Sequence, residues 1–260
     1  MLQLTRRAVL GAIAAAAAAA CAPRPSAAFT LDEVIRRHVE ARGGAAALDR
    51  VQACLIDVEI AEGGQTLLGR YAADASGLVR IDIHVADALV YSEGVDREGV
   101  WLWSRRDPAP SPSAATGAAN ALLNGAEGHL FGLHRYRERG HRVRLMPAVR
   151  IEGVDHEVVE IAFTTGHVSY LYIDHAAWLI ARRRDERAYH PDASEERQRI
   201  ETIFSDYRDV DGALYAFRNV DRDLDTGSQL STNQVRRRVT NPDFPEGMFA
   251  RTYQPPARWE

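Results

Sequence analysis

The chain contains nine histidines, which are its first candidates for metal binding or proton transfer. His129 and His134 are five residues apart, whereas two ligands on one helical face stand three or four apart. The spacing therefore favours solvated or hydrogen-bonded histidines over metal ligands. The sequence has no HExxH, CxxC or GxSxG motif and no phosphate-binding glycine loop, so no standard catalytic or metal site is expected.

Three aspartates near the C-terminus form a second candidate group. Asp206, Asp209 and Asp211 could act in acid–base chemistry or as calcium ligands. They stand beside Gly212, and aspartate next to glycine is typical of tight turns, where its carboxylate accepts backbone hydrogen bonds. We therefore expect a hairpin turn here.

Consecutive arginines, Arg236–Arg238, could contact acidic lipid headgroups. Side chains alternate along a strand, so Arg237 would point away from its two neighbours and no continuous basic face is expected. All 32 basic residues are arginine, and the formal net charge is −4. This balance gives no reason to expect nucleic acid as a partner.

Aromatic side chains are the better candidates for contacts to an apolar ligand. Two tryptophans, and separately two tyrosines, are spaced two residues apart, so each pair shares one face of a strand. Ordinary core packing is the alternative for each of them. The residues predicted to line an apolar binding cavity are Trp101, Trp103, Phe131, Leu133, Tyr170 and Tyr172.

The first 28 residues predict an export signal of the twin-arginine type. Arg6 and Arg7 precede the uncharged run Ala8–Ala20, and the small residues Ser26–Ala28 follow. The run is too short to cross a bilayer, which takes roughly 20 apolar residues. We therefore expect the protein to work outside the cytoplasm.

Two processing routes stay open for Cys21. Ala18–Cys21 fits a relaxed lipoprotein box, in which Cys21 is acylated and anchors the chain to a membrane. Cleavage after Ala28 would instead remove Cys21. Both routes leave Cys54 without a disulfide partner, and its place in the apolar alternation Val51–Val58 predicts a buried side chain.

The pattern of the remaining chain predicts a mainly β (α+β) fold that begins with helices. Leu31–Gly44 has helical spacing, after which the period becomes two. In Val79–Val85, apolar residues alternate with Arg80, Asp82 and His84, as in a half-buried strand. Short turns join about ten strands into an antiparallel meander, interrupted by one partly helical insert over 118–139. A sheet of this length must curl or close, and a curled sheet encloses a hollow.

Six short segments carry a family resemblance: Ala41–Gly44, Glu93–Trp101, Tyr136–Val143, Ile151–Asp155, Tyr170–Ile180 and Phe204–Gly212. Their order resembles that of the outer-membrane lipoprotein-sorting protein family, which has the LolA/LolB-type fold. The resemblance implies an unclosed barrel, that is, a strongly curved antiparallel sheet. N-terminal helices and the insert would cover its concave face. A single domain would span residues 29–250, followed by a tail over 251–260.

The resemblance also implies a function. We expect a non-enzymatic envelope protein, in the periplasm or at the outer membrane, that binds a lipid or a lipoprotein acyl chain. No cofactor is expected. One alternative is an envelope scaffold whose sheet edge takes a strand of a partner protein. Another is an exported enzyme with a non-standard site, because the twin-arginine route carries prefolded and often cofactor-loaded proteins.

Overall fold

A computed structural model describes residues 29–113, 122–123 and 125–255. The chain divides into two compact units, Met1–Thr30 and Leu31–Glu260, and the account below concerns the second. The predictions for Arg6, Arg7 and Cys21 lie outside the described residues. No helix in the described part of the chain is both long enough and apolar enough to span a bilayer.

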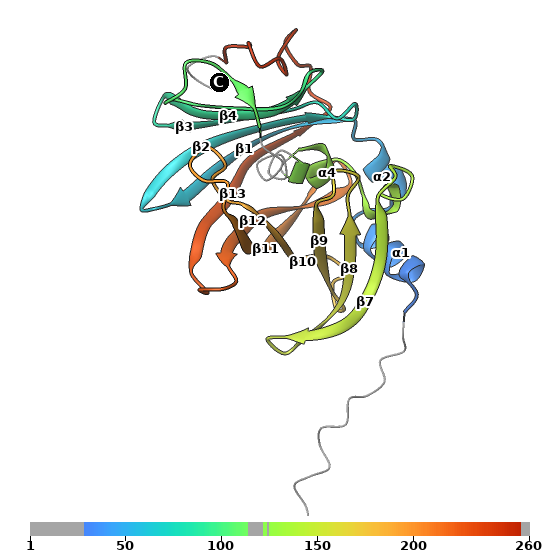
Figure 1. Cartoon of the computed structure of the whole chain (residues 1–260). Coiled ribbons are helices and arrows are strands. Elements are labelled where there is room, and N and C mark those ends of the chain that lie inside the picture. Colours follow the sequence, from blue (N-terminus) through green and yellow to red (C-terminus); the bar gives the residue numbers. More distant parts are fainter. Residues whose placement is uncertain (1–28, 114–121, 124, 256–260) are drawn as a thin grey trace, which may run out of the picture. The chain divides into compact units, whose positions relative to one another are not determined.

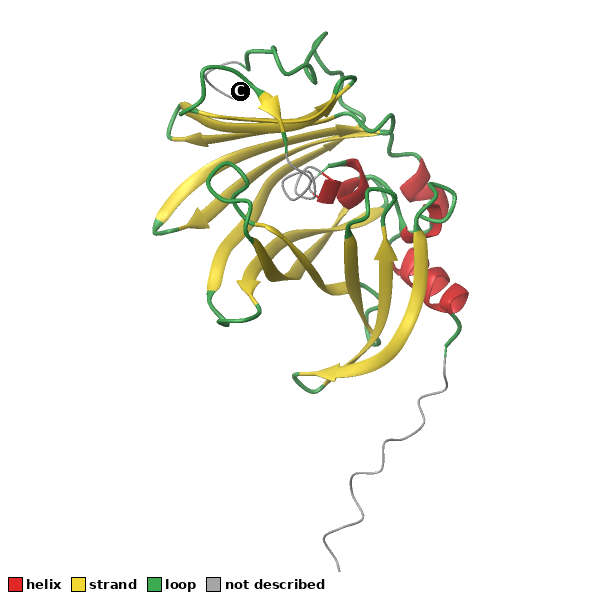
Figure 2. Ribbon diagram, viewed as in Figure 1, coloured by secondary structure: helices red, strands yellow, loops and turns green. Residues whose placement is uncertain are grey.

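The strands of the described residues form one antiparallel sheet that is not closed into a barrel (Figures 1 and 2). Their bounds are β1 Ala53–Glu62, β2 Gln65–Asp74, β3 Val79–Val85, β4 Ala88–Asp96, β5 Gly99–Ser104, β6 Ser111–Pro112, β7 Arg142–Ile151, β8 Val154–Ala162, β9 Val168–Asp174, β10 Ile180–Ala188, β11 Arg197–Val210, β12 Ala213–Asp223 and β13 Gln229–Thr240. The order in the sheet is β6-β5-β4-β3-β2-β1-β13-β12-β11-β10-β9-β8-β7. The predicted fold class is confirmed, with 13 strands in the described residues rather than about ten in the whole chain.

Short helices accompany the sheet. In the part of the chain that the structure describes they are α1 Leu31–Ala41, α2 Ala45–Asp49, α4 Ala126–His129 and the 3₁₀ helix η1 Leu133–Arg135. Helix α1 buries Val34, Ile35, His38 and Val39, which lie along one face of the helix. Helix α4 lies within the curve of the sheet (Figure 1).

The end of α1 is held against the turn between β11 and β12. Gly43 has φ +109°, and a Cβ there would lie 2.0 Å from the carbonyl oxygen of Gly212, so only glycine fits. Next to it, the Arg42 carbonyl accepts the N–H of Leu214 at 2.9 Å. The Arg42 Nε donates to the Leu214 carbonyl at 3.0 Å. These contacts fix the place of the Arg42 side chain.

The cross-strand register assigns side chains to the two faces of the sheet, because directly opposite residues share a face. We call the face that carries Tyr71 the inner face, since the His129 ring of α4 lies 6.3 Å from the Tyr71 ring. One inner row consists of Arg238, Ile56, Tyr71, Ile81 and Glu93. The next row along, on the outer face, consists of Asp57, Arg70, Asp82, Ser92 and Trp103.

The sequence predicted that β3 would be buried on one face and exposed on the other. The structure differs from this prediction on the outer face. Arg80, Asp82 and His84 are only 2%, 1% and 2% exposed. The C-terminal segment covers this face, since Arg80 Nη1 donates to the Ala250 carbonyl at 3.1 Å and its guanidinium lies 5.2 Å from the Tyr253 ring. An ion pair of 2.8 Å to Asp82 compensates the Arg80 charge. The strand is therefore buried on both faces.

A β-bulge in β13 changes the direction of the arginine triplet. Asp57 lies opposite Arg237 and Val58 opposite Val235, so Arg236 has no directly opposite residue. The extra residue shifts the alternation by one. Arg236 pairs with Glu59 on the outer side at 2.7 Å, and only Arg238 points to the inner face. The expectation that Arg237 alone would point away from its neighbours is therefore wrong.

Candidate functional site: a cavity on the inner face

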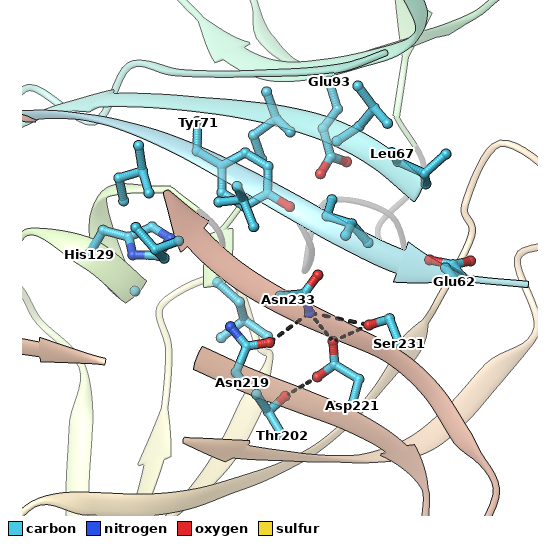
Figure 3. A pocket seen from close by; sticks show the side chains of 18 of the residues that line it. Glu62, Leu67, Tyr71, Glu93, His129, Thr202, Asn219, Asp221, Ser231 and Asn233 are labelled. Carbon is cyan, nitrogen blue, oxygen red and sulfur yellow. Dashed lines mark hydrogen bonds between the residues drawn. The ribbon is translucent and has the colours of Figure 1, made fainter. Parts of the chain in front are cut away.

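A cavity of about 510 Å³ lies on the inner face of the sheet (Figure 3). Its volume falls within the range of roughly 300–1,000 Å³ that is typical of small-molecule sites. Strands β1–β4 and β10–β13 supply its walls, and α4 contributes Gly128 and His129. The cavity thus lies between two distant parts of the sequence that the β1–β13 pairing brings together.

One wall is apolar, and it comes from the N-terminal strands. On β1 every second residue points inward, which places Ile56, Val58 and Ile60 on the cavity. Ile81 and Ile83 of β3 extend this wall by the same alternation. A surface of this kind favours hydrocarbon over water.

The opposite wall is polar and is joined by hydrogen bonds. Thr202 Oγ1 donates to Asp221 Oδ1 at 2.6 Å, and Ser231 Oγ donates to Asp221 Oδ2 at 3.3 Å. Asn233 Nδ2 donates to Asn219 Oδ1 at 2.6 Å and to Asp221 Oδ2 at 3.3 Å (Figure 3). Each of these buried or half-buried groups thereby has a partner within the wall.

A buried ion group continues the polar wall on β10. The Asp185 side chain is 0% exposed and pairs with Arg183 at 3.1 Å and with Arg187. Burial alone would raise the pKa of Asp185, but the charges of Arg187 and Arg183 outweigh it, so the pKa lies below its usual value. One carboxylate thus compensates two guanidinium groups.

An acidic end of the cavity lies around β4 and the loop after β10. Glu93 is 4% exposed, and the Tyr91 hydroxyl donates to its Oε2 at 2.7 Å. Burial raises the pKa of Glu93 to about 7, against the hydrogen bond from Tyr91, and the nearby Asp192 raises it further. At the same end, His190 Nε2 lies 2.5 Å from Glu62 Oε1. Glu93 can therefore be neutral or charged near neutral pH.

A basic end lies beside α4, around the ring of Tyr215. The guanidinium of Arg238 lies 3.6 Å from this ring, and that of Arg42 lies 5.0 Å from it. Arg238 Nη2 also donates to the backbone carbonyl of His129 at 2.8 Å. Arg42, Arg238, Tyr215 and His129 all line the cavity.

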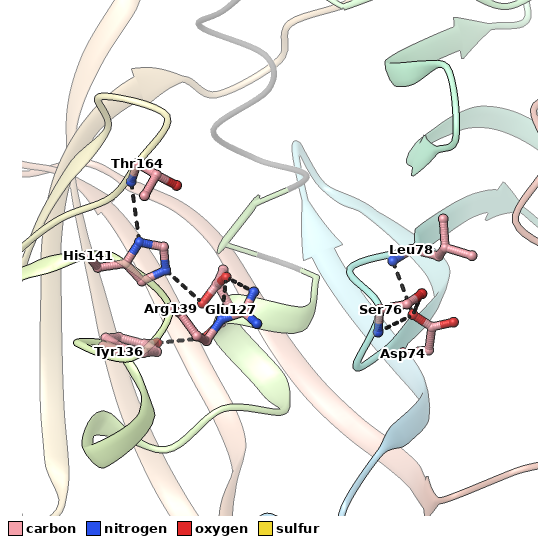
Figure 4. A network of polar contacts seen from close by, with 8 residues as sticks. All are labelled: Asp74, Ser76, Leu78, Glu127, Tyr136, Arg139, His141 and Thr164. Carbon is pink, nitrogen blue, oxygen red and sulfur yellow. Dashed lines mark hydrogen bonds and ion pairs between the residues drawn. The ribbon is translucent and has the colours of Figure 1, made fainter.

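Helix α4, which carries His129, is held by a network of polar contacts (Figure 4). Arg139 Nε donates to Glu127 Oε1 at 2.9 Å, and the Tyr136 hydroxyl donates to the Glu127 carbonyl at 2.6 Å. The backbone N–H of Thr164 donates to His141 Nδ1 at 3.3 Å. His141 Nε2 is then the protonated nitrogen, and it faces Glu127 Oε2 at 3.2 Å. This network fixes the helix over the cavity.

The four predicted strand aromatics lie on the outer face. Trp101 is 0% exposed and packs 5.5 Å from the Arg80 guanidinium, on the side away from the cavity. Trp103 lies opposite Ser92 in the outer row. Tyr170 and Tyr172 flank Leu171, which lies opposite the cavity residue Arg183, so their side chains point the other way.

The two predicted insert residues lie elsewhere. Leu133 is buried in η1. Phe131 packs against the cluster that contains Ile56, Val58 and Ile60, and the Arg139 guanidinium lies 3.6 Å from its ring. None of the six predicted residues lines the cavity, and ligand binding by them stays a prediction.

Residues that the sequence argument passed over line the cavity instead. The inward isoleucines had a signal in their period-two alternation, but alternation does not say which face is inner. Arg42 had none, because a helix end directs it. Arg238 belongs to the arginine triplet considered above, but the bulge decides that it points inward. Cys54 is buried as predicted, and burial raises its pKa. In the described residues no three His, Cys, Asp or Glu side chains stand together as metal ligands would.

Comparisons with known proteins show the fold. No protein-family model matches the chain, and no curated protein matches it. A LolA superfamily protein from Nitrosomonas europaea superimposes with a TM-score of 0.56 at 11% identity, over 85% of this chain and 98% of the other. A putative outer membrane lipoprotein-sorting protein domain from Vibrio parahaemolyticus gives 0.52 at 12%, over 84% and 95%. A DUF1329 family protein from Desulfovibrio piger gives 0.53 at 11%, over 84% and 96%. The chain has a LolA-like fold.

Proposed function

We propose that this protein is an exported, non-enzymatic envelope protein that binds an apolar ligand, a lipid or a lipoprotein acyl chain, in the cavity on the inner face. The observation that carries the proposal is a cavity of about 510 Å³ with one apolar wall of isoleucine and valine. The similarity of the fold to a putative lipoprotein-sorting protein domain supports it.

The apolar wall supplies the affinity. Burying a methylene group contributes about 0.8 kcal/mol, so several methylenes of a chain laid over Ile56, Val58 and Ile60 offset the loss of freedom on binding. The polar wall offers few unsatisfied groups to a hydrocarbon, because its side chains already bond one another.

The N-terminal segment supports export to the periplasm or the outer membrane. Arg6 and Arg7 before an alanine-rich run are typical of a twin-arginine signal. Acylation at Cys21 would tether the protein to a membrane, and cleavage after Ala28 would release it. The intact mass of protein purified from the envelope separates the two routes, since only the first retains Cys21 and adds acyl mass.

Native mass spectrometry of the purified protein tests ligand binding, followed by lipid extraction. We expect bound lipid that organic solvent removes. A protein that is ligand-free after purification and takes up no lipid from vesicles would contradict the proposal.

A cavity-filling variant gives the matched test. Ile83→Trp places a bulky ring in the cavity, and we expect it to lower lipid occupancy at least severalfold because the site loses volume. Leu68→Trp is the control, since Leu68 lies close by on β2 but is 43% exposed. Equal lipid occupancy in both variants would argue against this cavity as the site.

One observation favours a second candidate, an exported enzyme. Glu93 is buried in the cavity with a pKa of about 7, and carboxyl groups tuned in this way are frequent in active sites. The extracted ligand distinguishes the two functions. A ligand recovered chemically unchanged after long incubation supports binding alone, whereas conversion that disappears in Glu93→Gln supports an enzyme.

A further inference from the structure

The basic end of the cavity contains more positive charge than its surroundings compensate. Among the described residues, neither Arg42 nor Arg238 forms an ion pair with a carboxylate. Arg183 and Arg187, by contrast, share Asp185. Arg42 and Arg238 are both half-buried, and partly burying a guanidinium without a counter-charge is unfavourable; stacking on Tyr215 offsets only part of that cost.

Unused hydrogen-bonding atoms gather at the same place. Tyr215 Oη, His129 Nε2 and Arg238 Nε are buried and have no hydrogen-bond partner among the described residues. All three side chains line the cavity. Buried polar atoms normally have partners, so a cluster without them indicates a position for an external acceptor.

At the basic end of the cavity, the arginines carry the positive charge and His129 does not. Burial, and then the charges of Arg238, Arg183 and Arg42, lower the pKa of His129 to about 3. The imidazole is therefore neutral at physiological pH and can donate one hydrogen bond without adding charge. Burial also lowers the pKa of Arg42, as does the nearby Arg238, while neighbouring tyrosines oppose them. A guanidinium nevertheless stays charged in a protein.

An inner row of the sheet connects this end to an apolar surface. From Arg238 the row passes over Ile56, Tyr71 and Ile81 to Glu93. With strands about 4.8 Å apart, its ends are separated by roughly 19 Å along the sheet. The row begins with an uncompensated cation, continues over apolar side chains and ends at a carboxyl that repels a second anion when ionised.

We propose that the ligand of this cavity is an anionic amphiphile whose carboxylate or phosphate lies between Arg42 and Arg238, with its hydrocarbon over Ile56, Tyr71 and Ile81. The inference rests on the proposed function and adds the headgroup chemistry and the orientation of the ligand. The anion accepts charge-assisted hydrogen bonds from the guanidinium groups and from the Tyr215 hydroxyl. It also compensates the excess positive charge.

Titration calorimetry on the delipidated mature protein tests this with three probes of matched chain length: palmitate, palmitoyl lysophosphatidate and hexadecanol. We expect the anionic probes to bind about tenfold or more tightly than the alcohol, as charge-assisted hydrogen bonds imply. Tighter binding of palmitate, with a larger loss of affinity in an Arg238 variant, would identify a carboxylate as the headgroup of the natural ligand. The same result for lysophosphatidate would identify a phosphate.

Variants of the arginine triplet give a matched comparison. Arg238→Gln keeps an amide donor for the His129 carbonyl but removes the charge, so it should reduce the preference for anionic probes to about twofold or less. Arg237→Gln, one residue away and exposed on the outer face, should leave the preference unchanged. Tyr215→Phe keeps the ring for stacking and should weaken only the anionic probes, so it tests the site even if Arg238→Gln fails to fold.

The outcomes separate the two proposals. Equal affinity for palmitate, lysophosphatidate and hexadecanol would overturn the anionic headgroup and leave lipid binding standing. A preference for the anions that persists in folded Arg238→Gln and Tyr215→Phe would also overturn it. Failure of all three probes to bind would contradict the proposed function itself.

Discussion

The two halves of the inner face solve the problem of burial in different ways. Strands β1–β3 present isoleucine and valine, which need no partner. Strands β10–β13 present the polar side chains around Asp185 and Asp221, which pair with one another, whereas Arg238 at the basic end has no carboxylate partner among the described residues. The apolar half should therefore tolerate loss of atoms, whereas loss of one group from the polar half leaves its partner buried and unpaired.

The strongest test of this difference is Asp185→Asn in the polar half. The change removes the carboxylate that pairs with both Arg183 and Arg187, whose guanidinium groups stay buried. We expect the free energy of unfolding to fall by about 3–5 kcal/mol, because a buried charge then lacks its partner. Chemical denaturation monitored by circular dichroism measures the change.

Asp155→Asn is the control, because it removes one carboxylate charge from an ion pair that is exposed rather than buried. The Arg150–Asp155 pair spans 3.3 Å with both side chains more than half exposed, and exposed pairs contribute about 0–1 kcal/mol. Similar losses in both variants would mean that burial does not set the value of these ion pairs.

The acid at the boundary of the two halves predicts a pH dependence. The pKa of Glu93 is raised from its ordinary 4.5 to about 7 in the folded protein, chiefly by burial. The folded state therefore holds a proton that the unfolded state releases, and stability falls as pH rises from about 4.5 to about 7. In Glu93→Gln this loss should disappear, leaving the variant more stable than the wild type by roughly 3 kcal/mol at pH 8 and equal to it at pH 4.

Urea denaturation of both proteins at pH 4 and pH 8 measures this difference. Glu195→Gln, at an exposed loop position, is the control and should follow the wild type at both values. An identical pH dependence in Glu93→Gln and the wild type would assign the effect to another group.

The test with the smallest expected change in stability compares one near-isosteric substitution in the polar half of the inner face with one in the apolar half. Thr202→Val removes the hydroxyl that donates to Asp221 and accepts from Arg183, and it should cost about 1–3 kcal/mol. Ile81→Val removes one methylene from the apolar wall and should cost about 0.5–1.5 kcal/mol. Thermal unfolding of the two variants ranks them, and a greater loss for Ile81→Val would reverse the proposed contrast.

The sequence predicted the positions of helices and strands better than it predicted which residues pack against them. The predicted strand Val79–Val85 has the same bounds as β3, although both of its faces are buried, and the glycines after α1 mark the end of that helix. Such patterns depend on neighbours in the chain, which the sequence contains directly. The curved antiparallel sheet followed from the succession of short turns and from the family resemblance.

The candidate site was less predictable, because it depends on contacts between distant segments. Trp101 and Trp103 share a face, as predicted from their spacing, but the C-terminal residues Ala250 and Tyr253 cover that side. The bulge at Arg236 has no marker in the sequence, although it alone decides which arginine enters the cavity. Local periodicity pairs side chains on a face but does not identify the inner one.

The pairing of β1 with β13 has a consequence for how the chain folds. The two strands lie next to each other in the sheet although the register joins residues as far apart as Cys54 and Thr240. Contacts of such long sequence separation form slowly, since a long loop must close first. The half of the sheet containing β1 cannot join the other half until ribosomal synthesis has passed residue 240, so we expect the cavity to form only after β13 has been synthesised.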